Sequence, residues 1–324
     1  MNQPIYQEVF SRLLEAKHIL CLVDERLDGD SLGSTTALAD YLLSLGKSVT
    51  IHVSTEVPKK YALLPHLELC QTYTAQTLAK YPIDLVITFD CSDEQYVEML
   101  TSHLYPKPFL INIDHHLTNT RFGNLPLVFP ESPSTTEIIH QFFRQNHLYP
   151  STKAATALLC GIAFDTGIFM NESTGIRAFE SASELILEGA QIQPVIQMIF
   201  SGRSIDTLRV WGIALDRLYL HQEQQYLRTF LTSKDIESSG VNEEDIGGAF
   251  SNFLSLVTEI PTIFFLYETG GGVKVSMRST TKNIGSLARL FGGGGHKYAG
   301  GFFLANTRLV YHQNQWSIEE RKLV

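Results

Sequence analysis

Short apolar runs that alternate with helical segments are the feature that most limits the folds open to this chain. Four such runs occupy residues 18–23, 48–53, 84–89 and 108–113, and residues 31–45 have the apolar spacing of a helix. Strands that are apolar along their whole length are buried on both faces, as in parallel sheets covered by helices on each side. The first half of the chain is therefore predicted to be α/β, with a mainly parallel, doubly wound sheet.

Helices are predicted to follow this sheet. Residues 134–137, Ser-Thr-Thr-Glu, have the form of a capping box, and further helices are expected at 151–164 and 176–187. Together with the sheet they make a predicted first domain of residues 1–190. Residues 191–222 are predicted to form a helical linker.

The remaining residues, 223–324, differ in character. Strands are expected at 262–267 and 273–278, joined by a turn that contains three glycines. Along the second strand apolar residues alternate with polar and cationic ones, so one face is apolar and the other carries the charges. This region is predicted to be a smaller α/β C-terminal domain.

The charge of the chain limits its partners. Its formal net charge is −9, which argues against wide electrostatic wrapping of long duplex nucleic acid but not against a local basic pocket for a short phosphate-bearing ligand. No apolar run reaches the ~18–20 residues that cross a bilayer, and the N-terminus lacks the layout of a signal peptide. We therefore expect a cytoplasmic protein without a membrane partner. A homodimer is compatible with the sequence, which leaves the oligomeric state open.

Acidic residues and histidines stand at the ends of three predicted strands: Asp24, Asp28 and Asp30 after the first, Asp90 after the third, and Asp114, His115 and His116 after the fourth. One aspartate after one strand is most simply a helix cap or a turn residue. Helix capping and turn formation are a poorer explanation when three strands all end in this way. Carboxylates that converge at the carboxyl edge of a sheet repel one another unless a cation joins them.

The types of ligand narrow the choice of metal. Carboxylate oxygens with one or two imidazoles, and no thiolate, suit manganese or magnesium better than structural zinc. Two metals that share a carboxylate, about 3.5–4 Å apart, can activate a water and stabilise an in-line phosphoryl displacement. The cluster therefore indicates hydrolysis of phosphate esters.

Five motifs carry a resemblance to a known family. The first four, in order, are Asp28-Gly-Asp30, Asp90, Asp114-His115-His116 and Asp165-Thr-Gly167. They resemble the motifs of the DHH phosphoesterase superfamily. The fifth, residues 292–296 (GGGGH), resembles the substrate-binding motif of the DHH-associated second domain. In length and motif order the chain is most similar to the bifunctional oligoribonuclease and pAp phosphatase group, the nanoRNases.

The resemblance implies two divalent metal ions, with Mn²⁺ preferred over Mg²⁺ or Co²⁺. One site would use Asp28 and Asp90, with a ligand from position 24. The other site would use Asp30, Asp90, His115 and Asp165, so that Asp90 bridges the two ions. His116 would face the scissile phosphate as a hydrogen-bond donor or acid, and Asp114 would hold an imidazole in place.

One position departs from the family pattern. The family usually has histidine four residues before the first aspartate of its first motif, where this chain has Asp24, and Leu27 stands where proline is usual. One hypothesis is that Asp24 still binds metal, in an altered site that is weaker or more tolerant of magnesium. The other is that Asp24 does not contact metal and the first site is partly empty.

The second domain is expected to bind substrate. Gly293, Gly294 and Gly295 would let backbone N–H groups approach a phosphate closely, in a nest that His296 follows. Arg278, with Ser279 beside it, would supply a guanidinium to the same phosphate. The first domain would then hold the metals and the cleaved phosphate while the second grips the terminal nucleotide.

These expectations lead to one main function and two alternatives. The main hypothesis is a hydrolase that shortens oligoribonucleotides of a few residues from an end, as an exonuclease, and converts pAp to AMP. Hydrolysis of cyclic dinucleotides or their linear products uses the same motifs. A nucleotide-binding regulator with a decayed catalytic site is the third option, although Asp28, Asp30, Asp90, His115, His116 and Asp165 are all present.

Overall fold

The structure, a computed structural model, describes residues 3–170, 174–200, 204–241, 243–295, 297–312 and 315–321. The expected substrate-binding residue His296 lies outside the described residues. The chain divides into two compact units, Met1–Gly202 and Arg203–Val324. The predicted domain boundaries at residues 190 and 222 stay a prediction.

The first unit contains a six-stranded sheet in the order β3-β2-β1-β4-β5-β6, and every pair of neighbours in it is parallel. Its strands are β1 (His18–Val23), β2 (Ser48–His52), β3 (Cys70–Gln71), β4 (Leu85–Phe89), β5 (Phe109–Asp114) and β6 (Leu125–Val128). The predicted parallel sheet is confirmed. The two edge strands escaped prediction because β3 has only two residues and β6 is a four-residue run that contains Pro126.

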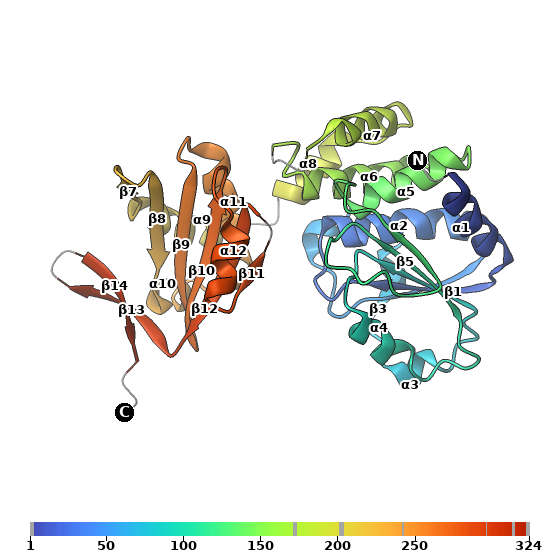
Figure 1. Cartoon of the computed structure of the whole chain (residues 1–324), viewed down its shortest axis with the longest axis horizontal. Helices are drawn as coiled ribbons and strands as arrows, with labels where there is room; N and C mark the ends of the chain where they lie inside the picture. Colours follow the sequence, from blue (N-terminus) through green and yellow to red (C-terminus); the bar gives the residue numbers. More distant parts are fainter. Residues whose placement is uncertain are drawn as a thin grey trace. The chain divides into compact units, whose positions relative to one another are not determined.

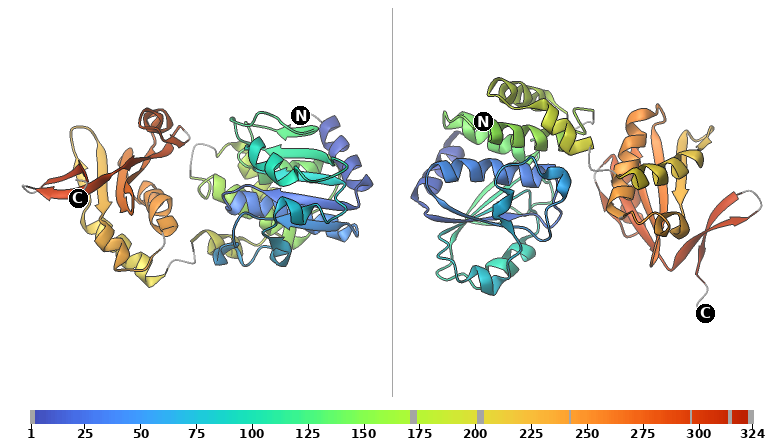
Figure 2. Two further views of the ribbon diagram at one scale, coloured as in Figure 1. Left: turned by 90° about the horizontal axis from the view of Figure 1, so that it is seen from below. Right: turned by 180° about the vertical axis from the view of Figure 1, so that it is seen from behind.

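Helices cover both faces of this sheet, as Figure 1 and Figure 2 show. Alternate residues of β1 enter different cores: Ile19 and Cys21 belong to one cluster, and Leu20 and Leu22 to the other. The larger cluster is closed by α1 (Gln3–Glu15), α2 (Gly29–Ser44), α5 (Thr135–Gln145), α6 (Thr152–Asp165), α7 (Ile176–Leu187) and α8 (Ile192–Phe200). The smaller cluster is closed by α3 (Ala75–Leu78) and α4 (Glu94–Thr101). Two short 3₁₀ turns, Lys59–Tyr61 and Leu67–Leu69, lie between β2 and β3.

Two helices begin next to the acidic residues, and each has a side-chain N-cap. Asp28 is the N-cap of α2, and its side chain accepts hydrogen bonds from the backbone N–H groups of Asp30 and Ser31. Ser134 caps α5 by accepting from the N–H of Glu137, as the sequence predicts. The expected capping box is otherwise wrong, because the Glu137 carboxylate bonds instead to Ser132 and Gln141.

The second unit is built on another six-stranded sheet, in the order β11-β12-β10-β9-β8-β7. Only β8 and β9 are parallel neighbours. The strands are β7 (Tyr219–His221), β8 (Tyr226–Leu231), β9 (Thr262–Thr269), β10 (Gly272–Ser279), β11 (Gly294–Gly295) and β12 (Ala299–Ala305). A separate antiparallel pair, β13 (Thr307–His312) and β14 (Gln315–Glu320), completes the strands.

In the described part of this unit the helices are α9 (Ile205–Asp216), α10 (Ser233–Glu237), α11 (Glu243–Val257) and α12 (Ile284–Leu290). The predicted alternation along β10 is confirmed, since Val273, Val275 and Met277 are buried while Lys274 is exposed. The expected helical linker contains α8 in the first unit and α9 in the second, followed by β7. Among the described residues, no helix combines the length and apolar character needed to cross a membrane.

Candidate metal centre

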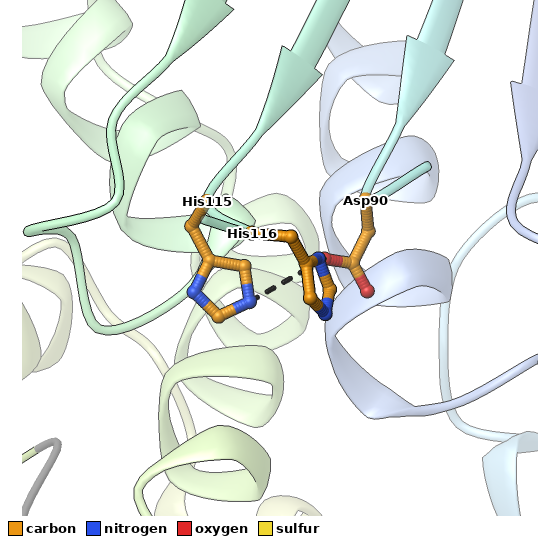
Figure 3. Close-up of side chains that lie close together, drawn as sticks. All are labelled: Asp90, His115 and His116. Carbon is orange, nitrogen blue, oxygen red and sulfur yellow. Dashed lines mark ion pairs between the residues drawn. The ribbon is translucent and has the colours of Figure 1, made fainter. Parts of the chain in front are cut away.

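The predicted acidic residues meet at the carboxyl edge of the first sheet. Asp90 follows β4, and Asp114 is the last residue of β5, with His115 directly after it. Asp30 lies in the first turn of α2, and Asp165 is the last residue of α6. Figure 3 shows Asp90, His115 and His116 converging from the ends of neighbouring strands. Parallel strands bring these residues together because their carboxyl ends share one edge.

Two groups of metal-binding side chains form here. In one, ligand atoms of Asp90, His115 and His116 all lie within 4.8 Å of one another, and in the other the same holds for Asp30, His115 and Asp165. His115 Nε2 is 3.0 Å from Asp165 Oδ2 and 3.5 Å from Asp90 Oδ1. The Asp90 oxygen is also 3.5 Å from His116 Nδ1. The two groups are adjacent because they share His115.

Asp28 and Asp24 occupy different positions from these groups. Neither joins a group of ligand atoms within the part of the chain that the structure describes. The Oδ1 atom of Asp28 accepts the two hydrogen bonds that cap α2. Asp24 Oδ1 accepts a hydrogen bond of 2.9 Å from the backbone N–H of Arg26, and the residue lines a polar pocket with Asp93 and Thr118. The roles assigned to Asp24 and Asp28 as metal ligands remain predictions.

Burial and mutual repulsion raise the pKa values of three carboxyl groups in the cluster, those of Asp28, Asp30 and Asp90. Burial, with the nearby charges of Asp165 and Asp30, raises the pKa of Asp28 to about 7. Burial and Asp165 raise the pKa of Asp30 to about 6, and burial and Asp30 raise the pKa of Asp90. Burial disfavours the charged form of His115, but the hydrogen bond to Asp165 and the surrounding carboxylates raise its pKa to about 9. Converging carboxylates of this kind repel one another unless a cation joins them.

The residues present fit a divalent metal. The donor set is mostly carboxylate oxygen with imidazole nitrogen, which suits manganese or magnesium. Burial and the neighbouring carboxylates raise the pKa values of Asp28, Asp30 and Asp90, and a bound divalent cation would stabilise their charged forms. Asp30, Asp90, His115 and Asp165 are the candidate ligands of such a metal.

Asp90 also has an unusual backbone conformation. Its φ is +59°, in the left-handed region that non-glycine residues seldom adopt at a cost of about 1–2 kcal/mol. A backbone hydrogen bond of 2.9 Å from Asp90 N to Ile113 O fixes this conformation. The strain therefore falls on the residue that the sequence predicts to bridge two metals.

Asp114 orients His116. Its Oδ1 atom accepts from His116 Nδ1 at 2.8 Å and from the backbone N–H of His116 at 3.0 Å, while Asn119 Nδ2 donates to Oδ2 at 2.6 Å. Burial favours the protonated acid, but these hydrogen bonds lower the pKa of Asp114. Burial alone would lower the pKa of His116, but the hydrogen bond to Asp114 raises it. A fixed carboxylate sets the ring orientation of a histidine in this way.

Two threonines at the start of α5 were not identified from sequence. The backbone N–H of Thr135 donates to Asp30 Oδ2 at 2.6 Å, and its hydroxyl donates to Asp90 Oδ1 at 3.0 Å. Thr136 donates to Asp30 Oδ1 from its backbone at 2.8 Å and from its hydroxyl at 2.6 Å. The sequence does predict that a helix starts at residues 134–137. It does not show that this end of the helix faces Asp30 and Asp90.

Gly161 of α6 lets these groups come together. A Cβ at this position would collide with the side chains of Thr136 and Asp30. A Cβ at Gly33 of α2 would collide with the carbonyl of Ala157 on the same helix α6. Glycine at both places allows α2 and α6 to pack closely enough for Asp30 and Asp165 to meet.

In the second unit Arg278 is half-buried near the end of β10. Its Nε donates to Asn252 Oδ1 at 2.6 Å and one terminal nitrogen donates to Met277 O at 2.8 Å. Burial lowers the pKa of Arg278 to about 10, which still leaves it charged at neutral pH. The Ser279 hydroxyl is buried and accepts from the backbone N–H groups of Thr281 and Lys282. That serine organises the turn after β10.

The glycine run forms part of the second sheet. Gly294 and Gly295 make the short edge strand β11, which pairs with Gly301 and Gly300 of β12. A Cβ at Gly293 would collide with the carbonyl of Gly301, and Gly295 has a φ of +135°. Close approach of two strands is thus one structural reason for these glycines, alongside the predicted phosphate contact, which remains a prediction.

Comparisons with known proteins agree with the resemblance found in the sequence. Residues 18–162 match the N-terminal domain of the DHH family, and residues 223–314 match the DHHA1 domain. The bifunctional oligoribonuclease and PAP phosphatase NrnA of Thermus thermophilus is 28% identical over 87% of this chain and 82% of its own length. The protein of the same name in Bacillus subtilis is 24% identical over 85% of this chain and 86% of its own length.

Solved structures share the fold. An exopolyphosphatase-related protein from Bacteroides fragilis has a TM-score of 0.84 at 23% identity, covering 93% of this chain and 91% of that one. RecJ of Thermus thermophilus, in complex with Mn²⁺, has a TM-score of 0.51 at 16% identity, covering 93% of this chain and 52% of that one. With both domain matches in the expected order, the chain belongs to the DHH family of phosphoesterases and carries a DHH domain followed by a DHHA1 domain.

Proposed function

We propose that this phosphoesterase hydrolyses short oligoribonucleotides from an end and converts pAp to AMP, using two divalent metal ions with Mn²⁺ preferred. The observation that carries the proposal is the pair of adjacent ligand groups that share His115. The relatives named as oligoribonuclease and PAP phosphatase, at 24–28% identity, support the choice of substrates. RecJ in complex with Mn²⁺ supports the use of a divalent metal.

The cluster suggests a division of roles in this reaction. The metals, when bound, would supply an activated water and charge stabilisation for an in-line displacement at phosphorus. Asp30, Asp90, His115 and Asp165 would hold them, with Asp28 beside them and Asp24 as a further candidate.

His116 is the candidate hydrogen-bond donor or acid for the scissile phosphate. Its Nδ1 is occupied by Asp114, so the orientation of the ring is set before substrate arrives. With its pKa raised by that contact, His116 retains a proton to higher pH than a free imidazole. Such a proton would stabilise the departing oxygen.

Arg278 is the proposed substrate contact in the second domain, together with Gly293, Gly294, Gly295 and His296. Its contact with Asn252 holds the guanidinium in one orientation, which favours a charge-assisted hydrogen bond to a phosphate. The net charge of −9 supports short substrates over long duplexes. The cytoplasmic location and the option of a homodimer stay predictions.

A substrate panel tests the proposal. The purified protein with Mn²⁺ is incubated with pAp, end-labelled RNA dimers to pentamers, the linear dinucleotide pGpG and cyclic di-AMP, and products are followed over time. We expect turnover of pAp and of the short RNAs, with shorter oligomers preferred. Turnover of pGpG or cyclic di-AMP alone would establish the alternative phosphodiesterase. Nucleotide binding without any turnover would establish the regulator instead.

A further inference from the structure

The start of α5 joins two carboxylates that come from different elements. Thr135 donates from its backbone N–H to Asp30 Oδ2 at 2.6 Å and from its hydroxyl to Asp90 Oδ1 at 3.0 Å. All three residues are buried, and Asp30 and Thr135 have no exposed surface. One residue therefore contacts a carboxylate from the start of α2 and a carboxylate from the end of β4.

The hydroxyl of Thr135 is not needed to cap its own helix. Ser134 already fills that role by accepting from the N–H of Glu137 at 3.1 Å. The neighbouring residue, Thr136, donates from both its hydroxyl and its backbone N–H to Asp30. Its hydroxyl therefore does not connect Asp30 to Asp90. Only Thr135, of these three, contacts both Asp30 and Asp90.

The contacts leave both carboxylates able to bind a cation. A carboxylate oxygen has two lone pairs, so Asp90 Oδ1 can accept from Thr135 and still face a metal. The hydrogen bond fixes which way that second lone pair points. The contacts of the same oxygen with His115 Nε2 and His116 Nδ1 are longer, at 3.5 Å each.

We propose that Thr135 is a positioning residue that holds Asp30 and Asp90 at the separation which metal binding requires. The inference rests on the proposed function, because it takes Asp30 and Asp90 as the metal ligands. Hydrogen-bond partners of metal ligands raise affinity by orienting the ligand, and their loss typically lowers metal affinity or activity about 10- to 100-fold. Thr135 acts on the metal through Asp90 and does not touch substrate.

The test measures metal binding directly, without substrate. Thr135→Val keeps the shape and the backbone N–H but removes the hydroxyl that contacts Asp90. We expect the Kd for Mn²⁺, from isothermal titration of the metal-free full chain, to rise about 10- to 100-fold. Thr135→Ser, which keeps the hydroxyl, is expected to restore the wild-type Kd. Thr135→Ala, which removes the hydroxyl without adding any atom, must weaken binding as Thr135→Val does.

Thr88→Val is the matched control. Thr88 is also fully buried, lies on β4 two residues before Asp90, and its hydroxyl has no hydrogen-bond partner among the residues that the structure describes. The same substitution there is expected to leave the Kd for Mn²⁺ unchanged. Wild-type Mn²⁺ affinity in both Thr135→Val and Thr135→Ala would overturn the inference, as would equal weakening in Thr88→Val.

Failure of the inference is distinct from failure of the proposed function. An Asp90→Asn variant measured beside the threonine variants reports on the metal site itself. Lost Mn²⁺ binding in Asp90→Asn with unchanged binding in Thr135→Val would reject the role of Thr135 alone. Unchanged binding and activity in Asp90→Asn would reject the metal centre.

Discussion

The two sheets of this protein carry candidate binding groups of different kinds at their edges, side chains in the first and backbone groups in the second. At the carboxyl edge of the first sheet the groups are ionisable side chains, with buried Asp30 and buried Asp90 each close to the half-buried His115. At the β11 edge of the second sheet they are backbone groups of glycine, near a strand that carries Arg278. The first arrangement costs folding free energy through repulsion, whereas the second costs it through the entropy of glycine.

This difference predicts different responses to substitution. A site made of repelling carboxylates loses function and gains stability when a charge is removed, because the repulsion that the metal would neutralise is gone. A site made of backbone and one arginine has no such repulsion to relieve. Substitutions in the two regions therefore separate chemistry from substrate binding.

The largest effect is expected for Asp90→Asn. Asparagine tolerates the positive φ at this position better than most residues, so the backbone should be kept. If Asp90 bridges two metals as proposed, loss of its charge should lower kcat/KM more than about 1000-fold, equal to about 4 kcal/mol of transition-state stabilisation. The metal-free variant should also unfold at a higher temperature than wild type, which calorimetry will show.

A matched control for that substitution lies on the surface of α9. Asp206 is half exposed and pairs with Arg209 at 2.9 Å. Asp206→Asn should leave both kcat/KM and the unfolding temperature near wild type, since exposed pairs contribute about 0–1 kcal/mol. Full activity in Asp90→Asn would contradict the assignment of a metal-bridging carboxylate.

A smaller effect is expected in the second unit. Arg278→Gln should raise KM for pAp about 10-fold or more while kcat changes little, because a charge-assisted hydrogen bond of about 1.5–3 kcal/mol is lost. Lys274→Gln, on the same strand but exposed, is the control and should leave KM unchanged. Steady-state kinetics at saturating Mn²⁺ measures both. Equal values for the two variants would argue that Arg278 does not contact substrate.

A pH dependence is expected in the first unit alone. Asp30 and His115, with pKa values of about 6 and about 9, must lose protons before they bind a cation, as must Asp28, with a pKa of about 7, in its predicted role as a ligand. The Kd for Mn²⁺ should therefore rise about tenfold for each proton and each pH unit below these values. Titration between about pH 5.5 and 8 measures it. Arg278 stays charged throughout, so substrate binding by the second unit should not follow this trend.

The same shifts set the sign of the stability change without metal. Because the folded pKa values of Asp28 and Asp30 lie above their ordinary values, the folded protein holds protons that the unfolded chain has released. The contribution of these residues to stability is therefore lost as the pH rises from about 4 to about 7. In Asp30→Asn that loss should be smaller, and an unchanged profile would contradict burial as its cause.

Much of the first unit could be predicted from local patterns. The runs that became β1, β4 and β5 are apolar along their length, which is a property of each strand alone. Because such strands lie parallel, the residues that follow them meet at one edge, and Asp90 and His115 could be placed together. The edge strand β6 was missed because a four-residue run with a proline carries too little pattern.

What the tertiary structure decided depends on packing between distant elements. Thr135 reaches Asp30 across 105 residues of sequence, and no periodicity within α2 or α5 indicates that contact. Likewise, the Glu137 side chain turned from the expected capping box to Ser132 because both residues are buried there. Local sequence thus determined which elements form and which chemistry they carry, since burial patterns repeat along each element. The orientation of each carboxylate was left to helix packing, because it depends on groups that meet only when the chain is folded.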